Sequence, residues 1–498
     1  MTSMKALPPK LLRMPPGHLV YAVLFLIAFL LRFPFFFRDY IDRDESTFIL
    51  VGQAWVDGYL PYTLLWDVKP PLTFFFFAGV IYCFGKSLIA IRLAGTFLVA
   101  SIGFSSYLLA KRFTDRRLAY AAAISIIYLC SLFGSIQGVM SEHILMAAFM
   151  SALVILTGAD RLMNWMLGGT LLGISLMIKI NFSMVVFLLG IWWMVDSFKR
   201  YEFPRAVGRI VALGLPGLAV ILTTFYPYYR SDQTDIWWNS VILAPLGYTQ
   251  GSGSSPIAAI LVTLSVVSFL AWAARSRRIS MRRKETICLV LTTLGVLWSF
   301  LQSGRINTHY LIQLYPPLVI LLSAALSLKV LHHASGKKGL VILILLLIPM
   351  ESTLEYVHVA RYRYERGQYY NGEGFSVPDY LRRNKLETEN ILFLGYHIGY
   401  WMLDRYPPVR TATHPSNLCK DEMFPYYNAQ RPTAMLELQY LMDSIRPPTV
   451  ITRLNKRIFD KQHREENAYM QASLKSHYRV VDTVEQAVIY EREKIRLE

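Results

Sequence analysis

Apolar residues gather in long runs over the first 350 residues of the chain. Runs such as 19–37, 182–195 and 257–274 are almost free of charged side chains. About 20 apolar residues suffice for a helix to cross the hydrocarbon core of a bilayer. The runs do not alternate apolar and polar positions as the strands of a membrane barrel do. The pattern therefore predicts a polytopic α-helical membrane protein.

The runs predict about eleven transmembrane helices in residues 1–352. One further apolar stretch, 72–84, is short and follows two prolines. We expect it to lie in the outer interface or to re-enter it rather than to cross. The expected spans are 19–37, 90–110, 118–137, 143–158, 164–179, 182–197, 209–228, 257–274, 286–301, 310–328 and 339–352.

Basic residues set the expected orientation. The net charge is +17, and the excess of Lys and Arg falls in short loops of the first 350 residues. Cytoplasmic loops are the ones enriched in Lys and Arg. The basic loops, together with the N-terminus, are therefore expected inside, and the C-terminus outside. Because the basic residues are divided among short loops, the charge does not indicate nucleic-acid binding. The loops are 111–117, 199–209, 275–284 and 332–338.

Residues 353–498 have a different pattern. A Tyr-rich stretch, 356–370, looks like a linker, and mixed helix and strand signals follow it. They predict a small soluble α/β domain on the extracytoplasmic side. We expect it to shape the entrance to a neighbouring site rather than to perform chemistry. The expected strands are 391–394, 449–452, 478–481 and 487–490, with a helix at 433–444.

An acidic cluster, Asp42 to Glu45, directly follows the first span. Carboxylates beside a bilayer are costly and call for a reason. Asp44 is the candidate general base, with a helix cap or an interface carboxylate as the alternative. Neighbouring carboxylates raise each other's pKa, so a raised pKa, as a base requires, is expected for Asp44. Glu45 is a candidate to share or orient that role. We expect Asp42 itself to lie at the surface.

Cations follow on the same outer loop, residues 38–90. Lys69 could bind a phosphate as a point charge, or it could be a lysine that reaches the interface. Asp67 is a candidate to orient it. Four further polar residues are expected on this face as candidate site residues, or as plain helix ends and anchors. These are Glu142, a second candidate catalytic carboxylate, and the candidate phosphate ligands Lys179, Arg305 and His309.

No cofactor is firmly indicated. The four cysteines show no metal-binding spacing and no disulfide framework. Acidic residues and histidines would allow a divalent cation, but no set of them stands out. A glycine-rich phosphate loop is also absent, which argues against a nucleotide-sugar donor.

Several motifs together resemble a known family. They are Asp44-Glu45, Gly58 to Tyr62, Trp66 to Pro71, Phe84-Gly85, Arg92-Leu93, Glu142, and His309-Tyr310 ahead of Pro316-Pro317. In this order they resemble the GT-C membrane glycosyltransferases related to protein O-mannosyltransferases and the lipid A aminoarabinose transferase. The resemblance covers roughly residues 15–330. Relatives often have His-Pro-Pro or Glu-Lys-Pro where this chain has Val68-Lys69-Pro70-Pro71.

The resemblance implies a transfer reaction on the non-cytoplasmic face. A hexose or pentose would move from a polyprenyl-phosphate carrier to a lipid, polysaccharide or protein acceptor. The family's acidic base corresponds to Asp44 or Glu45, and its second carboxylate to Glu142. The expected place is a cell membrane, namely the inner membrane of a bacterium. Two alternatives stay open: a transporter or flippase of a lipid-linked sugar, with charges at the bilayer midplane, and a non-catalytic lipid-binding protein.

Overall fold

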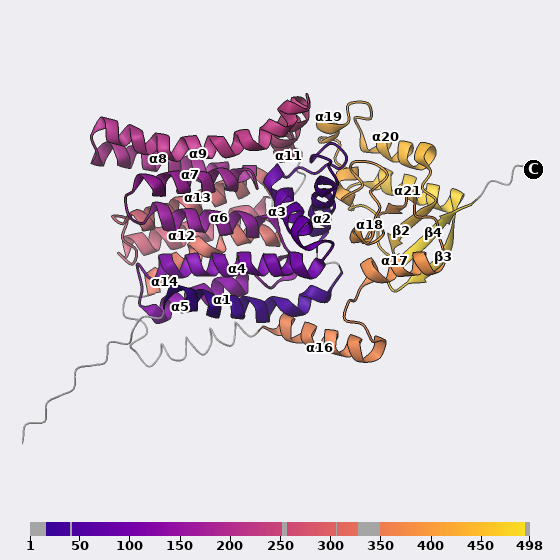
Figure 1. Cartoon of the computed structure of the whole chain (residues 1–498), viewed down its shortest axis with the longest axis horizontal. Helices are drawn as coiled ribbons and strands as arrows, with labels where there is room; N and C mark the ends of the chain where they lie inside the picture. Colours follow the sequence, from indigo (N-terminus) through magenta and orange to yellow (C-terminus); the bar gives the residue numbers. More distant parts are fainter. Residues whose placement is uncertain (1–15, 40–41, 251–255, 305, 327–348, 494–498) are drawn as a thin grey trace, which may run out of the picture.

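The computed structural model describes residues 16–39, 42–250, 256–304, 306–326 and 349–493. Its larger part is a bundle of helices whose long members run side by side (Figure 1). The longer helices are α1 (Gly17–Arg32), α4 (Leu88–Ala110), α5 (Arg116–Leu129), α6 (Ser141–Leu156), α7 (Leu162–Leu176), α8 (Ser183–Arg200), α9 (Phe203–Arg230), α12 (Ile257–Arg275), α13 (Lys284–Ser303) and α14 (Tyr315–Leu326). Two short helices, α10 (Thr234–Trp238) and α11 (Ala244–Gln250), follow α9.

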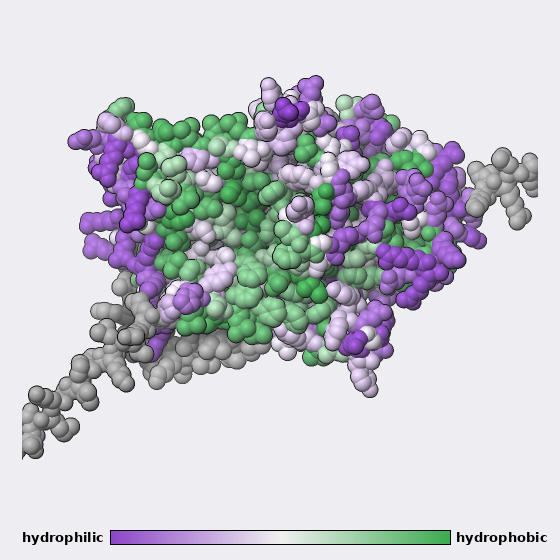
Figure 2. All heavy atoms as spheres, in the orientation of Figure 1, coloured by the Kyte–Doolittle hydropathy of each residue, from purple (hydrophilic) through white to green (hydrophobic). Residues whose placement is uncertain are grey.

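Six of the described helical segments are long and apolar enough to cross a membrane. They are Gly17–Phe37, Leu88–Ala110, Ile180–Arg200, Phe203–Arg230, Ile257–Arg275 and Lys284–Ser303. Figure 2 shows the matching surface, a broad apolar band over the bundle with hydrophilic residues at either end. The chain is thus a multi-pass membrane protein by length and composition, but the expected count of about eleven spans is not confirmed. Expected spans 143–158, 164–179 and 310–328 correspond to shorter apolar helices, and most of 339–352 lies outside the described residues.

Residues 38–90, which were expected to form an outer loop, contain two helices at one end of the bundle. Helix α2 (Arg43–Val56) packs against α3 (Pro71–Phe84) on one side and lies beside the C-terminal domain on the other (Figure 1). Their contact is close, since a Cβ on Gly52 would come within 2.8 Å of the Phe77 Cβ. The apolar stretch 72–84 is therefore a short helix at this end. Its place in the bilayer interface stays a prediction.

The C-terminal domain, residues 367–493, contains a sheet with the order β1-β2-β4-β3. Strands β1 and β2 pair in parallel, and the other pairs are antiparallel. All four expected strands are confirmed. They are β1 (Leu392–Phe393), β2 (Thr449–Arg453), β3 (Tyr478–Val484) and β4 (Ala487–Arg492), with helices α17 (Glu373–Arg383), α18 (Ile398–Met402), α19 (Phe424–Tyr427), α20 (Ala434–Gln439) and α21 (Arg464–His477) around them.

Alternation along the strands divides this sheet between two cores. Leu392 and Val450 point into a core of the domain's own, shared with side chains of α20 and α21. Phe393 and Ile451 point the other way, into a core continuous with that of the bundle. Successive strand residues face opposite sides, so one sheet joins both parts of the molecule.

The expected Tyr-rich linker is wrong for most of its length. Residues 350–366 form a helix, α16 (Met350–Arg366), whose Tyr356 hydroxyl donates to the carbonyl of Leu30 on α1 (2.9 Å). Glu355 on α16 also pairs with Arg38 (3.8 Å). Tyr356, Tyr362 and Tyr364 are therefore helix residues rather than loop residues, and Tyr356 contacts α1.

Candidate active site

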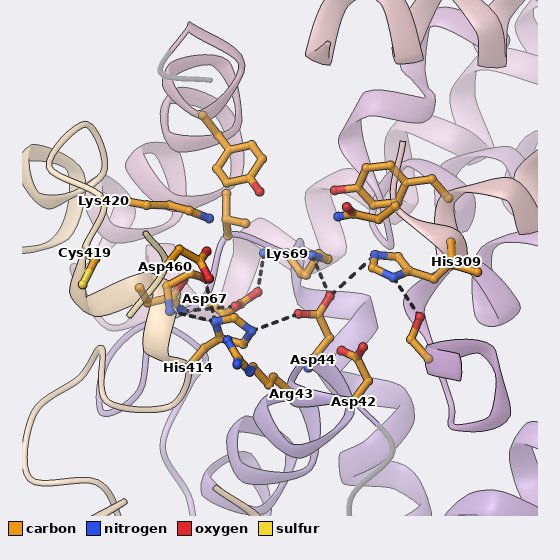
Figure 3. Close-up of a pocket in the computed structure, with 18 of the residues that line it drawn as sticks. Asp42, Arg43, Asp44, Asp67, Lys69, His309, His414, Cys419, Lys420 and Asp460 are labelled. Carbon is orange, nitrogen blue, oxygen red and sulfur yellow. Dashed lines mark hydrogen bonds and ion pairs between the residues drawn. The ribbon is translucent and has the colours of Figure 1, made fainter. Parts of the chain in front are cut away.

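A cavity of about 920 Å³ opens where the bundle meets the C-terminal domain (Figure 3). The bundle provides one half of its wall and the domain provides the other. The bundle half includes Asp42, Arg43, Asp44, Asp67, Lys69, Ser135, Tyr248, His309 and Tyr310. The domain half includes His414, Ser416, Asn417, Lys420, Arg453, Asp460 and His463.

Asp44 lies at the junction of the two halves, in the first turn of α2. The helix begins there because the Asp42 carboxylate accepts the backbone N–H of Asp44 (2.9 Å), which makes Asp42 the N-cap. The Asp44 carboxylate faces Lys69 at 3.7 Å, His309 at 3.9 Å and His414 at 3.6 Å. The alternative that Asp44 is only a cap is thus excluded, because Asp42 has that role.

Lys69 keeps Asp44 ionised. Burial alone would raise the pKa of Asp44, but nearby positive charge, first of all the Lys69 ammonium, outweighs burial and holds the pKa below its usual range. Burial would likewise lower the pKa of Lys69, yet the carboxylates of Asp44 and Asp67 raise it well above its usual value. The raised pKa expected for Asp44 from its acidic neighbours is therefore wrong, because a carboxylate and an ammonium face each other in the cavity.

The pKa of Asp42 is shifted in the opposite direction to that of Asp44. Burial, followed by the nearby Asp44 charge, raises the pKa of Asp42 to about 7. Sequence reasoning placed Asp42 at the surface, whereas the structure places it in the cavity wall. One carboxylate of this pair therefore stays charged while the other titrates near neutrality.

The loop before α3 fixes the backbone of Lys69 through two hydrogen bonds. The Asp67 carboxylate accepts the backbone N–H of Lys69 (3.2 Å), and the Tyr62 hydroxyl donates to the Lys69 carbonyl (2.6 Å). Asn417 of the C-terminal domain donates to the second oxygen of Asp67 (3.3 Å). The ammonium also lies 5.7 Å from the centre of the Phe48 ring. Asp67 thus lies where the sequence predicted an orienting residue for Lys69.

Glu142 and Lys179 form a buried ion pair with each other. The Lys179 ammonium lies 4.0 Å from the centre of the Tyr310 ring, and Tyr310 lines the cavity. Neither Glu142 nor Lys179 is itself in the cavity wall. The pair therefore lies behind the wall, where its charges act on the site through the field rather than through contact.

Glu45 faces away from the cavity. Its side chain pairs with Arg92 (3.0 Å) and accepts the backbone N–H of Val139 (2.9 Å), and the residue is only 2% exposed. Arg92 also donates to the carbonyl of Phe35 (2.5 Å). This arrangement ties the start of α2 to α4 and to the loop before α6. Of the two neighbouring acids, Asp44 lies at the cavity and Glu45 holds the scaffold.

His309 is the remaining candidate that the structure brings to Asp44, and its Nδ1 lies 3.4 Å from the Ser135 hydroxyl. Arg305 lies outside the described residues. Sequence reasoning missed His414 and the other domain residues of the wall. The run His414-Pro415-Ser416-Asn417 was a weak signal, since a polar cluster is ordinary in a soluble domain.

The sequence left open whether the site binds a divalent metal ion. Among the residues that the structure describes, no group of three His, Cys, Asp or Glu side chains is arranged to hold a metal ion. As placed, these residues do not fit a bound cation. The positive charge nearest to Asp44 is instead the Lys69 ammonium.

Comparison of the sequence with protein-family models and with curated proteins gives no match. Comparison of the fold with solved structures does give matches. ArnT from Cupriavidus metallidurans bound to undecaprenyl phosphate matches with a TM-score of 0.60 and 14% identity, over 95% of this chain and 97% of that one. The apo form of the same protein matches with a TM-score of 0.59 and 13% identity, over the same shares of the two chains.

The chain has the ArnT fold. The resemblance to GT-C glycosyltransferases seen in the sequence is thus confirmed at the level of the fold. The likeness to ArnT spans nearly the whole of both chains, so it includes the C-terminal domain, for which the sequence offered no motif. The archaeal oligosaccharyltransferase AglB from Archaeoglobus fulgidus, in complex with an inhibitory peptide and a dolichol-phosphate, is more distant. It has a TM-score of 0.49 and 11% identity, over 97% of this chain and 75% of that one.

Proposed function

We propose that this protein is a glycosyltransferase that uses a polyprenyl-phosphate-linked sugar as its donor. The observation that carries the proposal is the Asp44 carboxylate facing the Lys69 ammonium in a cavity at one end of a membrane bundle. The ArnT fold supports it, because one ArnT structure holds undecaprenyl phosphate. We place the cavity and the C-terminal domain on the outer face of a bacterial inner membrane, following the loop charges.

Each half of the charge pair has a task in the proposed reaction. The acceptor O–H gives its proton to Asp44 as its oxygen forms a bond to the anomeric carbon of the sugar. The bond from that carbon to the phosphate oxygen breaks, and the electron pair leaves with the phosphate. Lys69 stabilises this developing charge. When Asp44 takes the proton, Lys69 loses one of its two anionic partners, which favours its interaction with the phosphate.

The remaining residues support this pair. Asp67 orients Lys69 through its backbone, and His309 contacts Asp44 from the bundle side. Glu142 and Lys179 contribute their field from behind the wall, while Glu45 has a scaffold role. The sugar would be a hexose or pentose, and the acceptor a lipid, polysaccharide or protein.

The test uses the purified full chain in lipid nanodiscs. Polyprenyl-phosphate sugars extracted from native membranes are added with an envelope fraction, and released polyprenyl phosphate is measured by mass spectrometry. Asp44→Asn should lower turnover by at least about 100-fold, because it removes the base. Binding of undecaprenyl phosphate should survive. Asp379→Asn, an exposed aspartate on α17, is the matched control and should behave as wild type.

Two results would contradict the proposal. Turnover by Asp44→Asn within a few-fold of wild type would remove Asp44 as the base. A wild-type protein that binds undecaprenyl phosphate but never releases it from any sugar donor would favour a lipid-binding protein or a transporter.

A further inference from the structure

His414 of the C-terminal domain contacts the carboxylate that we propose as the base. Its Nε2 lies 3.6 Å from Oδ1 of Asp44. The two residues are 370 positions apart in the sequence, and Figure 3 shows them facing each other across the junction of the two halves of the wall. Catalytic contacts are often long before substrate binds and shorten in the reactive complex.

The surroundings of His414 fix which of its nitrogens carries the proton. The backbone N–H of Ser416 donates to Nδ1 (3.1 Å), and the Ser416 hydroxyl lies 2.6 Å from the same atom. A backbone N–H can only donate, so Nδ1 must be unprotonated. In the neutral ring the proton is then on Nε2, the nitrogen that faces Asp44.

The neutral ring is the form expected near pH 7. Burial lowers the pKa of His414 to about 3, although the Asp44 charge opposes that shift. Arg43, Lys69 and Lys420 also face the ring and disfavour a second proton. His309 differs, because its Nδ1 partner is a hydroxyl, which can donate or accept.

The backbone beside His414 is attached to the helix that carries Asp44. The Thr47 hydroxyl, one turn along α2 from Asp44, donates to the carbonyl of Thr413 (2.9 Å). The Thr413 hydroxyl in turn donates to the carbonyl of Trp66 (3.2 Å). Thr47 and Thr413 are both fully buried. The approach of His414 to Asp44 is therefore built into the interface and does not depend on a loose side chain.

We propose that His414 is a positioning residue for the reaction, supplied by the C-terminal domain. Its Nε2–H holds Oδ1 of Asp44, which leaves Oδ2, beside Lys69 and His309, as the oxygen that receives the acceptor proton. This assignment rests on the proposed function. It also changes the role expected for the domain, which would complete the base as well as shape the entrance.

A direct test needs no substrate. The full chain, labelled with ¹⁵N-histidine, is studied by NMR in lipid nanodiscs, and His414→Gln identifies the His414 signals by their loss. We expect a ring protonated at Nε2 whose signals shift in Asp44→Asn. A ring protonated at Nδ1, or signals unchanged by Asp44→Asn, would overturn the assignment.

The second test measures turnover in the assay with extracted polyprenyl-phosphate sugars. His414→Ala should lower kcat about 10-fold to 100-fold, the scale of a misplaced catalytic group, while binding of undecaprenyl phosphate stays within twofold. His414→Gln should recover most of the loss, because its amide N–H reaches the place of Nε2. His477→Ala, an exposed histidine at the end of α21, should match wild type.

The two proposals fail in different ways. If His414→Ala keeps kcat within twofold, or if Gln is no better than Ala, the positioning role is wrong while the glycosyltransferase proposal stands. If the wild-type protein shows no turnover at all, the proposed function fails. The NMR result then still decides whether His414 and Asp44 form the pair described.

Discussion

The two halves of the cavity wall are held in different ways. The bundle half rests on buried charge, with the pair of Glu45 and Arg92 directly behind Asp44. The domain half reaches the site through single hydrogen bonds, such as those from Thr47 to Thr413 and from Thr413 to Trp66. A buried ion pair is costly to break by removing one partner, whereas a single neutral hydrogen bond contributes little. The bundle half should therefore be rigid and the domain half more easily loosened.

The strongest test of this difference is Glu45→Gln. The change leaves the buried Arg92 without its anion, which should lower the free energy of unfolding by about 3 kcal/mol. Thermal melts in detergent would measure the loss, with turnover per folded molecule staying within a few-fold. Glu437→Gln is the matched variant in the C-terminal domain, away from the cavity wall. Its partner Arg431 is partly exposed and can turn to solvent, so its cost should be smaller. Equal losses in both variants would remove the contrast.

Lys69→Ala tests the bundle half by its effect on the affinity for undecaprenyl phosphate. Loss of a charge-assisted contact to the phosphate should weaken binding of undecaprenyl phosphate by about 2 kcal/mol, or roughly 30-fold. Isothermal titration on the chain in nanodiscs measures it. Lys86→Ala is the control, because Lys86 pairs with Asp404 and is not among the residues of the cavity wall. Unchanged affinity in Lys69→Ala would refute the phosphate role.

Thr47→Val should loosen the domain half alone. The substitution keeps the shape of the side chain and removes its hydrogen bond to Thr413, at a cost of about 1 kcal/mol. Hydrogen exchange should then speed up at the amides of residues 409–418 and stay unchanged in α4. Equal exchange in wild type and variant would mean that this bond does not hold the domain half in place.

Asp42→Asn should have the smallest effect and should depend on pH. The folded pKa of Asp42, about 7, exceeds its value in the unfolded chain. The cost of ionising Asp42 is therefore small at pH 4, which is close to the unfolded pKa, and is fully present only above pH 7. The variant, which keeps a capping side chain, should gain less than about 1 kcal/mol at pH 8, because Asp42 stays partly exposed. A melting temperature raised equally at pH 4 and pH 8 would contradict the assignment.

Sequence patterns predicted the bundle half far better than the domain half. Asp44 and Lys69 stand out because charges beside long apolar runs are rare and costly. His414 and Lys420 belong to a soluble domain, where polar residues are expected everywhere. The strands could be predicted from local alternation, but not the contact of the domain with α2, since that depends on residues far apart in the chain.

Asp44 and Glu45 show a second limit. Consecutive residues of a helix point about 100° apart, so one of two adjacent acids can face a cavity while the other faces the bundle. The sequence predicted that an acid here would matter, but not the rotation of α2. The number of spans is not confirmed, for a different reason. Helices such as α5 and α6 are too short to be recognised as spans by length alone, and their neighbours in the bundle cover them.

The sheet of the C-terminal domain has a consequence for protein engineering. Because its Phe393 and Ile451 side chains belong to the core of the bundle, the domain cannot be exchanged for another as a separate cassette. A chimera joined at residue 367 would place foreign side chains against α2 and leave an unmatched apolar surface there. A workable graft would have to carry α2 with it, and with α2 the Asp44 that the incoming domain is meant to serve.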